Sequence, residues 1–205
     1  MINSKEILAL ILALVILAFS NSFINTGKFI NSLFIFAIIL IIYVSVKKAT
    51  AYYYEAEEET KIWSFQRYGL YERSYFKKPI PMIWFPLFLS LITKGLLWWL
   101  AILEFDVEAR AERASRRHGL YRFTEVTEWH IAWIAVWGII INALAAIIGY
   151  VLGFEFFAKL GIYYCIWSLI PLSSLDGSKI FFGKRILWIF MAVIGIILLW
   201  WGSTL

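Results

Sequence analysis

The chain has 205 residues, of which 62% are hydrophobic and only 16% are charged, and its mean hydropathy is +0.77. This composition excludes an ordinary soluble domain and predicts an all-α polytopic membrane protein that contacts membrane lipids. The formal net charge of +5 does not indicate a nucleic-acid partner, because basic residues in a membrane protein first report topology and contact with anionic lipid. The single cysteine, Cys165, lies in an apolar run and excludes an internal disulfide.

Long apolar stretches predict membrane-spanning helices within a single membrane domain, residues 1–205. A helix needs about 20 residues to cross the hydrocarbon core of a bilayer. Stretches near this length predict five spans, at about 7–20, 29–46, 129–152, 156–172 and 186–201. The first stretch also has the outline of a cleavable signal peptide, with a lysine, an apolar core and small residues in that order. We treat it as a helix that is retained.

A sixth apolar stretch, 82–103, is predicted to enter the membrane and turn back. It contains a central Lys94–Gly95 pair, and a charge midway along a lipid-facing helix is costly. Basic residues are frequent on both sides of it, in 47–81 and 104–128, and a single crossing would place them on opposite sides of the membrane. A re-entrant segment that turns at Lys94–Gly95 leaves both regions in the cytoplasm. The N-terminus of this cell-membrane protein is then expected to be cytoplasmic.

Two charged segments in these cytoplasmic regions are interpreted as solvated surface structure. Residues 106–123 alternate acids and bases at helical spacing, which predicts a surface helix. Residues 52–63 are similar in composition. Their carboxylates could bind a divalent cation, although a charge run is more often a solvated face; they are Glu55, Glu57, Glu58 and Glu59.

The predicted span 129–152 carries two features beyond its apolarity. Gly138 and Asn142 are four residues apart and share a helix face, and a row of small residues, Ala145, Gly149 and Gly153, favours close approach of another helix. An asparagine deep in a membrane helix needs a hydrogen-bond partner. One candidate is the polar segment that follows Pro171, because proline breaks that helix and frees a backbone carbonyl.

Two motifs in this half of the chain resemble elements of the site-2 proteases, which are intramembrane zinc metalloproteases. That family has a Gly-Pro-x-x-Asn-like element on one helix and, two segments on, Asn-x-x-Pro-x-x-x-Leu-Asp-Gly, whose Asp completes the zinc site. The corresponding sequences here are Gly138-Ile-Ile-Ile-Asn142 and Ser168-Leu-Ile-Pro171-Leu-Ser-Ser-Leu175-Asp176-Gly177. The resemblance covers about residues 30–185. It implies a site-2-protease-like core in which Asp176 occupies the position of a zinc ligand.

The family's third element, His-Glu-x-x-His, is absent from the sequence. At its expected place the chain reads Lys47-Lys48-Ala49-Thr50-Ala51, so lysines replace one ligand and the general base. A protonated lysine has no lone pair for zinc. The resemblance therefore implies a catalytically degenerate protein with no catalytic residue, metal or cofactor. We expect it to bind or scaffold transmembrane segments of other proteins, alone or as an oligomer.

Without a metal, Asp176 would be an unpaired carboxylate near hydrocarbon, which is costly. We expect either that Lys47 or Lys48 forms a salt bridge with it, or that Asp176 caps a local turn through its own backbone.

Two other functions remain open. One is an active zinc metalloprotease with a rebuilt site; its possible ligands are Glu55, His118, Glu128, His130 and Asp176. The other is a small channel or transporter subunit in which Lys94, Asn142 and Asp176 line a polar path.

Overall fold

The structure is a computed structural model that describes residues 3–23, 26–67, 75–110 and 126–205. These residues are mostly helical, with four short strands that the sequence analysis did not anticipate. The helices are α1 (Ser4–Asn21), α2 (Phe29–Tyr53), α3 (Phe85–Ile92), α5 (Glu128–Val151), α6 (Glu155–Ser168), α7 (Asp176–Gly183) and α8 (Arg185–Thr204), and a short 3-10 helix, η1 (Thr26–Lys28), precedes α2. The strands are β1 (Ala56–Ile62), β2 (Ser64–Arg67), β3 (Tyr75–Pro81) and β4 (Leu103–Ala109).

Four of the described helices, α1, α2, α5 and α8, are long and apolar enough to cross a membrane, and each coincides with a predicted span. These helices indicate an integral membrane protein. The stretch 156–172 is helical only within α6, whose 14 residues span about 21 Å, less than the hydrocarbon core of about 30 Å. The number of crossings and the orientation remain predictions.

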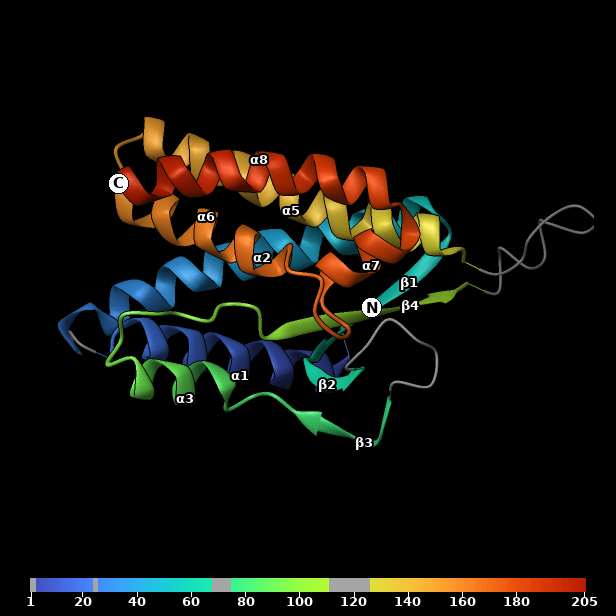
Figure 1. The fold of residues 1–205 in the computed structure, drawn as a ribbon, viewed down its shortest axis with the longest axis horizontal. Coiled ribbons are helices and arrows are strands. Elements are labelled where there is room, and N and C mark those ends of the chain that lie inside the picture. Colours follow the sequence, from blue (N-terminus) through green and yellow to red (C-terminus); the bar gives the residue numbers. More distant parts are fainter. Residues whose placement is uncertain (1–2, 24–25, 68–74, 111–125) are drawn as a thin grey trace, which may run out of the picture.

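Helix α5 is the centre of the helical packing. It contacts α2, α6 and α7, while α8 lies on α6 and α7, and α1 lies between α2 and α3 (Figure 1). Small residues permit the close contact with α6, because a Cβ added to Gly149 would lie 2.4 Å from the Phe157 ring. Gly153, in contrast, lies in the turn after α5 with φ +87°, so it does not belong to a continuous row on that helix.

The chain reverses direction at the Lys94–Gly95 pair, as the sequence predicts. Lys94 and Gly95 have positive φ values of 53° and 78°, and the chain then returns without regular secondary structure to β4. The Ser20 hydroxyl ties α1 to α3 through hydrogen bonds with the Ser90 hydroxyl and the Pro86 carbonyl. Entry of this hairpin into a membrane remains a prediction.

Both charged segments that we expected on the surface contribute to an antiparallel ladder between β1 and β4. In 106–123, the residues 106–109 belong to β4 rather than to a helix, and the expected helix beyond them lies outside the described residues. In β1, burial alternates with a period of two, and Glu58 and Thr60 point inward. The prediction was wrong because polar residues occupy the inward positions, which hides the usual strand pattern.

Candidate functional site

A buried ion pair joins α2 to α7. The Lys47 Nζ lies 2.6 Å from the Asp176 Oδ2, and the two side chains are only 2% and 1% exposed. The Tyr43 hydroxyl, one turn earlier on α2, donates a hydrogen bond to the same carboxylate oxygen. Asp176 is also the first residue of α7, where the backbone N–H groups favour a negative charge. Of the two expectations for Asp176, the structure contains the salt bridge, formed by Lys47 and not by Lys48.

Aromatic rings surround the cationic side of this pair. The Lys47 Nζ lies 4.0 Å from the Tyr43 ring centroid and 4.1 Å from that of Phe105. Lys179, one turn after Asp176 on α7, places its Nζ 3.9 Å from the Phe105 ring. Burial lowers the pKa of Lys179, an effect that the nearby Asp176 opposes. Two lysines thus lie over the ring of Phe105, one paired with Asp176 and the other 3.8 Å from the Asp106 Oδ1.

Gly138 and Asn142 position α5 against α2. A Cβ added to Gly138 would lie 3.1 Å from the Lys47 Cγ and 3.2 Å from the Tyr43 ring, so glycine leaves room for the lysine stem. The Asn142 Nδ2 donates to the Ile39 carbonyl at 3.3 Å, and its Oδ1 has no hydrogen-bond partner among the described residues. The predicted partner, the segment after Pro171, is wrong, because the face of α5 that carries both residues turns toward α2.

The motif around Pro171 sets the position of α7. Helix α6 ends at Ser168, and the chain passes through Pro171 before α7 begins at Asp176. A Cβ added to Gly177 would lie 2.2 Å from the Leu169 carbonyl oxygen. Only glycine allows the first turn of α7 to approach the end of α6 this closely. This approach places the Asp176 carboxylate over α2.

Strands β2 and β4 also hold the loop between α6 and α7, through hydrogen bonds to Ser174. The Ser174 hydroxyl donates to the Ser64 carbonyl at 3.2 Å and hydrogen-bonds to the Glu104 carboxylate. Glu104 also accepts a hydrogen bond from the Ser64 hydroxyl at 3.1 Å. Burial raises the pKa of Glu104, which the hydrogen bonds from Ser174 and Ser64 partly offset. The loop before Asp176 is therefore fixed by β2 and β4 as well as by α6.

Lys48 belongs to a separate network. Its Nζ lies 2.6 Å from the Glu6 Oε1 and 3.4 Å from the Glu58 Oε2, and the Thr60 backbone N–H donates to Glu6 at 2.9 Å. Successive helix residues point about 100° apart, so Lys47 and Lys48 cannot serve the same site. Burial raises the pKa of Glu58, which the charges of Lys47 and Lys48 partly offset. This network connects α1, α2 and β1.

The donor groups do not fit a zinc site. Within the part of the chain that the structure describes, no three His, Cys, Asp or Glu side chains are grouped to hold a metal ion. The Nδ1 of His130 lies 2.6 Å from the Thr127 hydroxyl oxygen, and the expected ligand His118 lies outside the described residues. The ammonium group of Lys47 lies against the carboxylate that would bind zinc. Neither a rebuilt site nor a cation site in the Glu55–Glu59 segment gains support.

Three contributors to the cluster were not predicted from the sequence. Tyr43 lies four residues before Lys47 and Lys179 three residues after Asp176, so helical spacing could have identified both. Phe105 comes from β4, a strand that was not predicted, and no sequence signal placed it there. The predicted polar residue Lys94 is exposed in the turn after α3. In Figure 1 this end of α3 lies away from α7.

Comparisons with protein families, curated proteins and solved structures give no match to this chain. The resemblance to site-2 proteases therefore rests on the sequence motifs alone.

Proposed function

We propose that this chain is a catalytically degenerate site-2-protease-like membrane protein that binds transmembrane segments of other proteins. One observation carries the proposal. Lys47 stands where the resemblance places the first histidine ligand, Asp176 stands where it places the acidic ligand, and the two form a buried ion pair. In this proposal a salt bridge takes the structural role that the metal has in an active relative.

The chemistry of the cluster supports binding without hydrolysis. A protonated lysine cannot coordinate a metal or accept a proton from water. The position of the general base is Lys48, which is engaged by Glu6 and Glu58. The pair and the Tyr43 hydrogen bond instead fix α2 relative to α7, and α5 packs against both.

The hairpin built on α3 is the surface that we assign to partner segments. Its outward side chains are large and apolar, and Trp84, Phe88 and Leu91 are all exposed. Exposed apolar surface of this kind marks membrane or protein contact. The opposite side of the hairpin is tied to α1 through Ser20, so the hairpin presents a supported face.

Site-specific photocrosslinking in native membranes tests the proposal. A photoreactive phenylalanine analogue replaces Phe88 on α3 or, as the control, Phe190 on α8; the two side chains are 61% and 62% exposed. We expect discrete adducts at position 88, with the crosslinked peptide lying in a membrane-spanning segment of an uncleaved protein. Position 190 should yield lipid adducts only.

Equal adducts at both positions, adducts with soluble proteins only, or cleaved partner segments at position 88 would each contradict the proposal. The first two outcomes would show that the α3 hairpin does not bind transmembrane segments specifically. The third requires a hydrolytic site.

A further inference from the structure

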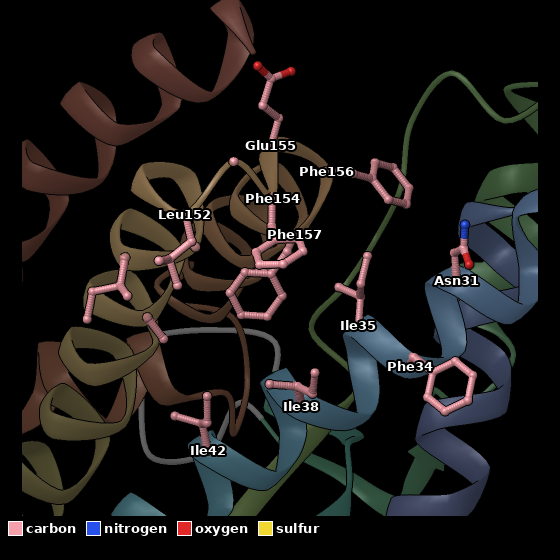
Figure 2. A pocket seen from close by; sticks show the side chains of 14 residues that line it. Asn31, Phe34, Ile35, Ile38, Ile42, Leu152, Phe154, Glu155, Phe156 and Phe157 are labelled. Atoms are coloured by element: carbon pink, nitrogen blue, oxygen red, sulfur yellow. The ribbon is translucent and has the colours of Figure 1, made fainter.

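A large apolar groove lies between α2 and the helical hairpin formed by α5 and α6, and Figure 2 shows its side chains. Its volume is about 800 Å³, within the range of about 300–1,000 Å³ of small-molecule sites. Ile35, Ile38 and Ile42 line it from α2, and Leu152 and Phe157 line it from the other side. The groove plays no part in the Lys47–Asp176 cluster.

The length of the groove indicates what it holds. Along α2 the groove runs from Asn31 to Ile42, and at 1.5 Å per residue this is about 17 Å. The hydrocarbon core is about 30 Å thick, so the groove extends over about one leaflet. One acyl chain of one leaflet needs only this depth.

A cation lies toward the end of the groove where α2 begins, and the lining at that end also includes Glu155. The groove begins where α2 starts and α5 ends, a position expected at the membrane–water interface. Lys28, just before α2, is exposed and places its Nζ 5.6 Å from the centroid of Phe156, a residue of the groove wall. A lysine at an interface keeps its charge in the headgroup layer and attracts lipid phosphate.

We propose that this groove binds one acyl chain of a phospholipid, with the phosphate held at Lys28. An apolar channel one leaflet deep and a cation at its mouth complement the two parts of such a lipid. This inference is independent of the function proposed above.

Native mass spectrometry of the full chain in detergent, titrated with palmitoyl-oleoyl phosphatidylglycerol, tests the site. Ile38→Trp fills the groove, while Ile41→Trp adds the same side chain to the same helix outside it; these isoleucines are 48% and 65% exposed. We expect a one-to-one lipid adduct in wild type and Ile41→Trp, weakened about fivefold or more in Ile38→Trp. Lys28→Ala should weaken it, and Lys77→Ala, at an exposed lysine on β3, should not.

Circular dichroism of each variant establishes that it is folded. Equal lipid adducts in the two tryptophan variants would refute the groove as the binding site, because the lipid would then be bound nonspecifically on the outer surface. Diacylglycerol, which lacks phosphate, should bind the wild type and Lys28→Ala equally well. If phosphatidylglycerol also binds these two proteins equally well, the phosphate contact is refuted. Crosslinking at position 88 in Ile38→Trp separates the two proposals, since lipid can be lost while partner adducts remain.

Discussion

Replacing Lys47 by methionine leaves Asp176 buried without its cation. At 2.6 Å the attraction of the pair is about 6 kcal/mol for an effective dielectric constant of about 20. Desolvation of the two ions, several kcal/mol each, offsets most of this gain. With the lysine removed, the Tyr43 hydroxyl and the N-terminus of α7 compensate only part of the desolvation of the carboxylate, so we expect the free energy of unfolding to fall by about 3–5 kcal/mol. For a chain of this size the midpoint of thermal unfolding should fall by roughly 6–20 °C.

Thermal unfolding of the detergent-solubilised chain, followed by circular dichroism, measures the effect. Lys77→Met, at an exposed lysine, is the control and should stay within about 0.5 kcal/mol of wild type. The double variant Lys47→Met, Asp176→Leu should recover much of the loss, because an apolar pair carries no desolvation cost. The ion pair would be refuted if Lys47→Met lost less than about 1 kcal/mol and the effect of the double variant equalled the sum of the effects of Lys47→Met and Asp176→Leu alone.

Three further changes probe the elements around the pair. Gly177→Ala forces a Cβ against the Leu169 carbonyl, so the free energy of unfolding should fall by about 1–3 kcal/mol or more. Gly195→Ala is the control in the same unfolding assay and should cost little, because its added Cβ would lie 3.1 Å from a flexible leucine methyl group. Lys48→Met should lower the free energy of unfolding by about 1–2 kcal/mol, less than Lys47→Met, because Lys48 is 23% exposed and Glu6 keeps hydrogen bonds from the Asn3 and Thr60 backbone N–H groups; an equal cost would contradict this ranking. The raised pKa of Glu104 means that this residue keeps its proton to higher pH in the folded chain than in the unfolded chain, so the free energy of unfolding should decline as the pH rises above about 4.5 toward the folded pKa. Glu104→Gln should reduce this pH dependence of unfolding, and an unchanged pH dependence would refute the assignment.

Hydropathy was sufficient to locate α1, α2, α5 and α8, because membrane spans require long apolar runs. Because a carboxylate close to hydrocarbon needs a partner, charge reasoning limited the partner of Asp176 to Lys47, Lys48 or its own backbone, and the structure contains Lys47. Helix geometry then explains why only one of the two adjacent lysines reaches Asp176.

The sheet region could not be predicted in the same way. In β1 the inward side chains include Glu58 and Thr60, whose partners come from α2 and from the strand itself. Because polar residues occupy these inward positions, no alternation of hydrophobicity marks the strand. The partner of Asn142 was missed for a related reason: a backbone carbonyl on α2 leaves no sequence signal.

Zinc content tests the central claim most directly. The variant Lys47→His, Lys48→Glu, Ala51→His restores the family's motif on α2, where Lys47 and Ala51 are both buried one turn apart. Mass spectrometry of the washed proteins should find no stoichiometric zinc in wild type, one zinc per chain in the restored variant, and loss of that zinc when Asp176→Ala is added. One zinc per wild-type chain, lost in Asp176→Ala, would contradict the account, and so would a folded restored variant that binds no zinc.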